Sequence, residues 1–199
     1  IICVAGANDA MTPAGAISAL EHLENYQIVI GQLEIPQEVT IAAFRKAQDF
    51  GAITILNPAP FASISPDLIA VSDWIIPNES EYAGIHNPGL VATSDENILE
   101  LAATLKARFV VTLGEKGAAF TTRDGEIRRV TAPQVNAIDT TGAGDAFVGA
   151  FAVGLAANLP DEKAIALGCA CASESVTRLG TQSSYPTPAQ AQEILRSID

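Results

Sequence analysis

Short apolar runs rich in isoleucine and valine alternate with longer segments of helical spacing through the first 114 residues. The strand-like runs are IICVAG (1–6), YQIVIGQ (26–32), AITILN (52–57), DWIIPN (73–78) and RFVVTLG (108–114). The segments with helical spacing cover residues 13–25, 37–50, 79–83 and 95–107. Strands that alternate with helices predict an α/β fold, with a mainly parallel β-sheet and helices on both of its faces.

The remaining sequence departs from this alternation. Residues 118–131 contain two strand-like runs around Asp124-Gly125, a dipeptide typical of a tight hairpin turn. From residue 142 onward the pattern predicts helices over 142–157, 161–178 and 188–198. We find no linker and no internal repeat, and therefore expect a single domain over residues 1–199.

Composition excludes several classes of protein. The chain is 48% hydrophobic and has a formal net charge of −12 with only 11 Lys and Arg residues, so we expect no nucleic-acid partner. No apolar run reaches the roughly 18 residues of a membrane span, and no secretory leader is recognisable, so we expect a cytoplasmic protein without a membrane partner. The three cysteines, Cys3, Cys169 and Cys171, lack metal-ligand spacing and are expected to be buried and reduced.

The segment NAIDTTGAGDAFVGAFA, residues 136–152, places two glycines and an aspartate at the start of an apolar helix. Glycine inside a helix costs about 1 kcal/mol relative to alanine, so packing alone does not explain them. A helix amino terminus presents free N–H groups and attracts anions. We predict an anion-binding cradle formed by Gly142, Ala143 and Gly144. Asp145, beside it, is the candidate general base for an attacking hydroxyl.

The alternative is a purely structural helix start. In that interpretation Thr141 is the N-cap, Asp145 interacts favourably with the helix dipole, and the glycines permit tight packing. This alternative accounts for Thr141 and Asp145 but not for the Gly-Ala-Gly run that follows the strand-like VNAID (135–139).

The sequence DTTGAGDAFVGAF resembles the carboxy-terminal signature of the ribokinase-like, phosphofructokinase B-type sugar kinases. Further motifs of that family follow its order and rough spacing: LNPAP (56–60), IIPNESE (75–81), VTLGEKGA (111–118) and VTRLGTQSS (176–184). The resemblance covers essentially the whole chain and implies a three-layer αβα fold. It also implies that the amino-terminal third of the family, with its lid and a sugar-binding aspartate, is absent from this sequence.

The resemblance implies transfer of the ATP γ-phosphoryl group to a primary hydroxyl of a small sugar, with ribose as the expected acceptor. Asp145 is then the base that contacts the sugar, and the cradle residues stabilise the transferring group. Glu34, in GQLEIP, is implied to point into the sugar site, and a loop carboxylate in water remains the alternative. A homodimer is expected for the protein of native length.

The family's Asn-x-x-Glu motif corresponds to Asn78 and Glu81, which the resemblance implicates in organising Mg²⁺ and the phosphates. The same spacing also fits a capping box at a helix start. By resemblance, ATP is contacted by Thr112, Gly114, Gly117 and Gly144. For the TLGEKG loop (112–117), a simple strand-to-hairpin turn remains open.

A monovalent cation such as K⁺ is implied between Asp139 and the turn-rich segment that follows the helix over 161–178. The residues implicated by position are Asp139, Thr141, Ser175, Arg178, Gly180 and Ser184. Two other functions remain open: a nucleoside kinase or other sugar kinase on the same scaffold, and a catalytically silent nucleotide-binding module. A dinucleotide-binding dehydrogenase is disfavoured, because no Gly-x-Gly-x-x-Gly follows an early strand.

Overall fold

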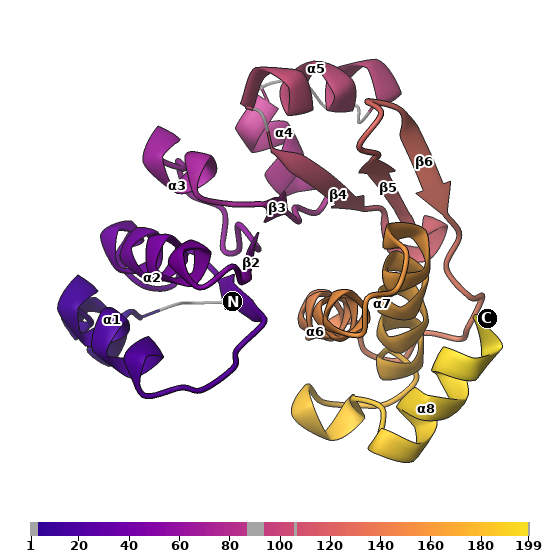
Figure 1. Ribbon diagram of the computed structural model, residues 1–199. Coiled ribbons are helices and arrows are strands. Elements are labelled where there is room, and N and C mark those ends of the chain that lie inside the picture. The colour runs from indigo at the N-terminus through magenta and orange to yellow at the C-terminus, as the bar shows by residue number, and fades with distance from the viewer. Residues whose placement is uncertain (1–3, 87–93, 106, 199) are drawn as a thin grey trace. The chain divides into compact units, whose positions relative to one another are not determined.

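The computed structural model describes residues 4–86, 94–105 and 107–198. They fall into two compact units: residues 1–110 with 121–127, and residues 111–120 with 128–199. Six strands form a sheet in the order β1-β2-β3-β4-β5-β6, so the predicted α/β class is confirmed (Figure 1). The expectation of a single domain over residues 1–199 stays a prediction.

The parallel strands lie in the first unit, apart from residues 111–112 at the end of the fourth, which belong to the second. β1 (Ile28–Gly31), β2 (Ile53–Leu56), β3 (Trp74–Ile75) and β4 (Arg108–Thr112) pair in parallel, with Ile30 opposite Ile55 and Ile75 opposite Phe109. Side chains of these strands, including Ile55, Leu56, Ile75 and Phe109, are fully buried. Burial on both faces explains the continuous apolar runs of β2, β3 and β4, whereas Ile30 of β1 is exposed.

The connecting segments of this unit are helical. They are η1 (Gly6–Ala10), α1 (Pro13–Glu21), α2 (Gln37–Asp49), α3 (Pro66–Ala70), α4 (Glu79–His86) and α5 (Asp95–Leu105). α2 packs on β1 and β2, and α1 and α3 pack against α2. α3 was not predicted, although Ser65 caps it by accepting a hydrogen bond from the Leu68 amide at 3.2 Å.

The predicted opening strand is not formed in the described residues. Its first three residues lie outside them, and Val4 and Ala5 have no regular structure. Gly6 begins a 3₁₀ helix with φ of +53°, which is outside the extended region that a strand requires. The strand-like VNAID run is likewise irregular, so its prediction as a strand was wrong.

The second unit contains several helices and most of the strand residues of a short hairpin, whose turn, within residues 121–127, belongs to the first unit. Neighbouring strands β5 (Ala118–Thr121) and β6 (Ile127–Val130) are joined by a tight turn in which the Thr122 amide donates to the Glu126 carbonyl at 2.8 Å. Strands joined so closely run antiparallel, which confirms the predicted hairpin. The other elements are η2 (Gly114–Lys116), α6 (Ala143–Ala156), α7 (Asp161–Ser175), η3 (Gln182–Ser184) and α8 (Pro188–Ser197).

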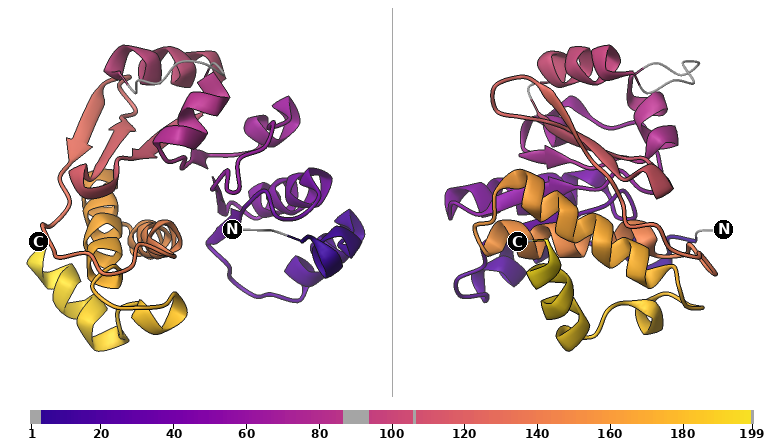
Figure 2. Two further views of the ribbon diagram at one scale, coloured as in Figure 1. Left: turned by 180° about the vertical axis from the view of Figure 1, so that it is seen from behind. Right: turned by 90° about the vertical axis from the view of Figure 1, so that its right-hand side faces the viewer.

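α7 packs along α6 and contacts α8 (Figure 2). Close approach depends on two glycines: a Cβ at Gly154 would lie 2.8 Å from Ala164 Cα, and one at Gly168 would lie 2.9 Å from the Phe147 ring. Cys169 and Cys171 of α7 are buried as predicted, and Cys3 lies outside the described residues. Among the helices of the described ranges, none has both the length and the apolar character of a membrane span.

Candidate active site

The head of α6 leaves two backbone amides without a partner. Gly142 precedes the helix in the left-handed conformation, with φ of +79°, and its carbonyl accepts the Ala146 amide at 2.9 Å. The Ala143 amide donates to the Thr140 carbonyl at 3.2 Å. Within the described residues the amides of Gly144 and Asp145 donate to no carbonyl, as helix geometry requires of a first turn. Two N–H groups are therefore free for an external acceptor.

The interpretation of Thr141 as the N-cap was wrong. The cap position is Gly142, which has no side chain with which to bond the first turn. The Thr141 amide instead donates to Asp139 Oδ1 at 3.0 Å, which ties Thr141 to the loop before α6. The first turn therefore lacks the internal acceptor that a threonine cap would supply.

The Asp145 carboxylate is exposed on the third residue of α6. It has no hydrogen bond or ion pair with another described residue. Its charge acts on Tyr185: burial, and after it the Asp145 charge, raise the pKa of the Tyr185 hydroxyl. An exposed carboxylate beside free amides is chemically able to accept a proton from a bound hydroxyl. The catalytic role of Asp145 stays a prediction.

Asp139 joins two loops of the second unit. Its Oδ1 accepts the Thr141 amide and its Oδ2 accepts the Gly180 amide, each at 3.0 Å. Hydrogen bonds from the Thr141 amide, the Thr141 side chain and the Gly180 amide hold the pKa of Asp139 below its usual value. The Val176 carbonyl adds a second link by accepting the amides of Ile138 and Asp139. The segment before α6 is thus fixed to the segment after α7.

Arg178 and Ser184 meet within the same region. Arg178 Nη1 donates to the Ser184 carbonyl at 2.9 Å, and its other terminal nitrogen pairs with Glu174. The Ser184 hydroxyl is fully buried and donates to the Thr181 carbonyl at 2.7 Å. Ser175, also buried, instead turns its hydroxyl toward the Ala172 carbonyl of its own helix. Of the predicted cation residues, Asp139, Thr141 and Gly180 are in direct contact, and Arg178 contacts Ser184.

Oxygen atoms for a cation are present around Asp139. Among the described residues, the carbonyls of Thr141, Arg178 and Gly180 accept no hydrogen bond. Because a guanidinium has no lone pair, Arg178 can contribute only its carbonyl. Throughout the described ranges, this region included, no group of three or more His, Cys, Asp and Glu side chains is placed to hold a metal ion.

The loop after β4 folds into η2 between Leu113 and Gly117. Gly117 has φ of +95°, and a Cβ there would lie 1.9 Å from the Val130 carbonyl oxygen. Gly114 has φ of +58° and open space around its Cα, and Thr112 is half-buried at the end of β4. The close approach of the Val130 backbone therefore explains why position 117 requires glycine, without any ligand. Nothing in the sequence indicated this contact. The nucleotide contacts assigned to this loop stay a prediction.

Asn78 and Glu81, in the first unit, form the capping box that remained open in the sequence. Asn78 Oδ1 accepts the Glu81 amide at 2.9 Å, and Glu81 Oε2 accepts the Asn78 amide at 2.8 Å. Burial raises the pKa of Glu81, against the opposing effect of the hydrogen bond from Asn78. Glu34 lies in the same unit, exposed in the loop between β1 and α2. The ligand roles of all three stay predictions.

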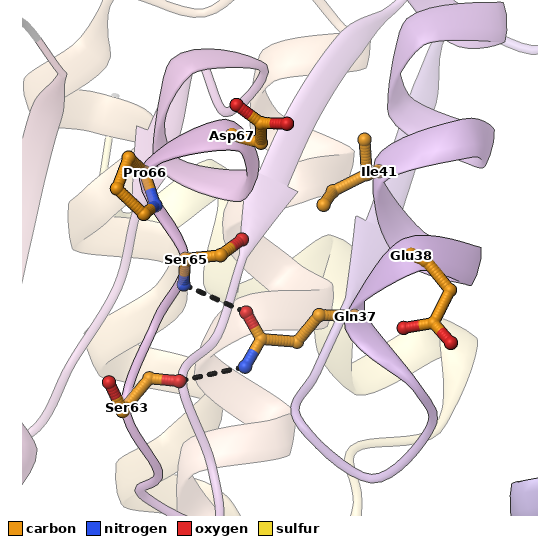
Figure 3. A pocket seen from close by; sticks show the side chains of 7 residues that line it. All are labelled: Gln37, Glu38, Ile41, Ser63, Ser65, Pro66 and Asp67. Carbon is orange, nitrogen blue, oxygen red and sulfur yellow. Dashed lines mark hydrogen bonds between the residues drawn. The ribbon is translucent and has the colours of Figure 1, made fainter.

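The first unit also contains a polar pocket of about 660 Å³ that the sequence did not indicate (Figure 3). Gln37 closes one side of it: its Nε2 donates to the Ser63 carbonyl at 2.7 Å, and its Oε1 accepts the Ser65 amide at 2.9 Å. The other lining residues are Glu38, Ile41, Pro66 and Asp67. None of the predicted site residues lines this pocket.

Known proteins of similar sequence support the resemblance. Residues 1–188 match the model of the pfkB family carbohydrate kinases. The ribokinase of Staphylococcus aureus (strain COL) is 36% identical over 197 residues, covering 95% of this chain and 63% of that protein. The deoxyribokinase of Salmonella typhi is 36% identical over 200 residues, covering 98% and 64%. The chain therefore spans less than two thirds of the length of these curated relatives.

Solved structures show the same relationship. The ribokinase of Thermotoga maritima superposes with a TM-score of 0.85 at 33% identity, over 98% of this chain and 64% of that one. An Arabidopsis thaliana ribokinase, solved with ribose and ATP, has a TM-score of 0.81 at 28% identity, over 90% and 59%. Fold, motifs and overall identity agree, and the chain belongs to the pfkB family of carbohydrate kinases.

Proposed function

We propose that this chain is part of an ATP-dependent sugar kinase that phosphorylates a primary hydroxyl of a small sugar, with ribose as the first acceptor to test. The observation that carries the proposal is the head of α6, where the free amides of Gly144 and Asp145 adjoin an exposed carboxylate. Amides aimed at developing charge, together with a base, are what in-line phosphoryl transfer requires of a protein.

In the proposed reaction the sugar hydroxyl attacks the γ-phosphorus of ATP. A new oxygen–phosphorus bond forms as the bond to the ADP oxygen breaks, and the hydroxyl proton passes to the Asp145 carboxylate. Ala143 and the left-handed turn at Gly142 set the direction of the first-turn amides. Those amides then stabilise the negative charge of the transferring group.

ATP is proposed to lie along the loop of Thr112, Gly114 and Gly117, with its phosphates toward α6. Magnesium, when bound, neutralises phosphate charge and keeps most of its own waters. Glu81 fits a role in that water shell, because its carboxylate can accept further hydrogen bonds beside the one from the Asn78 amide. Asn78 Oδ1 already accepts the Glu81 amide and the Ser80 hydroxyl, so Asn78 can contribute only through its Nδ2 donors. We propose that these two side chains orient the metal's waters.

A monovalent cation such as K⁺ also fits the residues around Asp139. Three kinds of oxygen ligand are available to a cation: the Asp139 carboxylate, which is ionised at neutral pH, the Ser184 hydroxyl, and backbone carbonyls that accept no hydrogen bond. These carbonyls come from Thr141, Arg178 and Gly180; the Ser175 carbonyl, which could add a further oxygen, already accepts the Arg178 amide at 3.4 Å. We propose that these oxygens hold the cation and that it stiffens the loop leading into α6.

Replacing Asp145 with asparagine tests the catalytic assignment in a protein of native length. We expect kcat to fall by more than about tenfold, because loss of a general base costs about 10²–10⁴-fold, whereas the affinity for ATP should change little. Asp124→Asn, an exposed carboxylate in the hairpin turn, is the matched control and should leave turnover unchanged. Retention of more than about a tenth of kcat by Asp145→Asn would defeat the role given to it.

Acceptor screening tests the substrate. Ribose, deoxyribose, fructose, 2-keto-3-deoxygluconate and adenosine should be compared by kcat/KM, since a ribokinase and a deoxyribokinase are both 36% identical to this chain. Preference for adenosine would favour a nucleoside kinase. If Glu34 faces the sugar, Glu34→Gln should raise KM for the acceptor and leave KM for ATP unchanged.

The alternative from another class is a nucleotide-binding module without chemistry. Titration calorimetry with ATP, followed by a product assay on the same sample, separates the two: binding without transfer at native length favours the module. Cytoplasmic location and a homodimer at native length remain predictions, which fractionation and light scattering would check.

A further inference from the structure

Tyr185 packs against the turn that begins α6. A Cβ placed on Gly142 would lie 3.0 Å from the Tyr185 hydroxyl oxygen, 3.4 Å from Tyr185 Cε1 and 3.4 Å from Thr181 Cβ. The ring therefore covers the left-handed glycine directly. Tyr185 is half-buried and follows η3, more than 40 residues along the chain from Gly142.

The segment that presents this ring is held in place from several sides. The Gly180 amide donates to Asp139 Oδ2, and the Ser184 amide donates to the Thr181 carbonyl at 2.9 Å. The Ser184 carbonyl accepts Arg178 Nη1, and Ser184 itself is fully buried. Because its neighbours are fixed, the Tyr185 side chain has a defined position over the turn.

We propose that Tyr185 is a positioning residue for the phosphoryl site: its ring keeps Gly142 in the left-handed conformation and thereby orients the amides of Gly144 and Asp145. The inference rests on the proposed function of those amides. It goes beyond it by assigning a residue outside the signature motif to the geometry of the site.

The physical reason lies in the freedom of glycine. Glycine populates positive and negative φ about equally, so nothing in Gly142 itself selects the φ of +79° that it adopts. Neighbouring atoms must make the selection, and those of Tyr185 and Thr181 are the nearest, beyond the adjoining residues, to the position that a Cβ on Gly142 would take. Without the ring, the turn would sample other conformations, and the two amides would lose their common direction.

Two substitutions in the protein of native length distinguish the contribution of the Tyr185 ring from that of its hydroxyl. We expect Tyr185→Ala to lower kcat about tenfold or more with KM for the sugar nearly unchanged, since misaligned amides weaken the transition state selectively. Tyr185→Phe keeps the ring and should stay within about threefold of the unchanged protein. A loss in Tyr185→Phe as large as in Tyr185→Ala would overturn the assignment to the ring.

Tyr26→Ala controls for the loss of a packed tyrosine ring elsewhere. Its ring lies 5.6 Å from that of Phe50 in the first unit, and its removal should lower stability without a selective loss of kcat. If Tyr26→Ala and Tyr185→Ala change kcat equally, the effect of Tyr185 is general destabilisation and the proposal fails.

A test without catalysis keeps the inference separate from the proposed function. Amide hydrogen exchange and NMR shifts of Gly142, Gly144 and Asp145 should change in Tyr185→Ala and not in Tyr185→Phe. In a double-mutant cycle, Gly142→Ala should perturb these amides less when Tyr185 is alanine, because the contact at 3.0 Å is then gone. If the effects of Gly142→Ala and Tyr185→Ala were additive, the proposed role of the contact would be refuted, even if Asp145→Asn had already confirmed the kinase mechanism.

Discussion

Gly117→Ala is the substitution for which the structure gives the sharpest expectation. Gly117 combines φ of +95° with ψ of −126°, and an added Cβ would lie 1.9 Å from the Val130 carbonyl oxygen and 2.7 Å from the Ala132 amide nitrogen. Real Cβ atoms essentially never come closer than 3.0 Å to such atoms. Because both partners are backbone atoms, neither can turn away as a side chain would.

The magnitude follows from two contributions. Holding alanine in a backbone conformation that suits glycine costs about 1–3 kcal/mol. Forcing a methyl group into an occupied space costs about 1–3 kcal/mol more. We therefore expect Gly117→Ala to lower the free energy of unfolding by about 2–6 kcal/mol, a large share of the stability of an ordinary domain.

Gly125→Ala is the matched control. Gly125 has φ of +78° in the turn between β5 and β6, and a Cβ there would meet no atom within 4 Å. It carries the conformational cost, about 1–2 kcal/mol, without the clash. Any gain from a less flexible unfolded chain is common to both variants, so their difference reports the clash at Gly117 together with the extra cost of its backbone conformation.

Urea unfolding followed by circular dichroism measures both variants. Provided that the m value is unchanged, the shift in midpoint gives the loss of stability. A Gly117→Ala protein no less stable than Gly125→Ala would refute the reasoning, since it would mean that the loop does not approach Val130 as closely as the structure shows.

Further predictions concern the capping box, Asp139 and the buried thiols. Glu81→Ala should cost about 1 kcal/mol in urea unfolding by removing the reciprocal bond to Asn78, whereas Glu79→Ala, exposed in the same turn, should cost little. The folded pKa of Asp139 is depressed, so its contribution to stability is complete above the unfolded pKa of about 4 and is lost as pH falls through the lower folded value. The stability difference from Asp139→Asn should therefore shrink on acidification, and a constant difference would contradict this. Burial raises the pKa of Cys169 to about 12, so iodoacetamide should modify it in urea and not in the folded protein, as peptide mass mapping would show.

The fold class could be predicted because it depends on local patterns. Continuous apolar runs such as the one around Ile55 indicated strands buried on both faces, and Asp124-Gly125 indicated the hairpin turn. The limits of local patterns appear at Gly6, where an apolar run resembled a strand but the backbone turns into a 3₁₀ helix. Apolar character predicts burial more directly than it predicts conformation.

The candidate site was predicted in part for the same reason. Glycines before an apolar helix signal a helix start open to an anion, so Gly142, Gly144 and Asp145 could be named from the sequence alone. Which residue caps that helix was not predicted: the Thr141 amide bonds the nearby Asp139, and Asp139 is held in turn by the amide of Gly180, which only the fold brings close.

By itself, then, the sequence determined the alternation of strands and helices apart from α3 and the opening segment, the hairpin, and the helix whose amino terminus is proposed to bind phosphate. Only the tertiary structure decided that the Val130 backbone leaves no room for a side chain at position 117, and that Tyr185 covers the turn at Gly142. The physical reason is the distance along the sequence between the residues that interact. Periodicity and capping depend on residues within a few positions of one another, whereas these contacts join segments that only packing brings together.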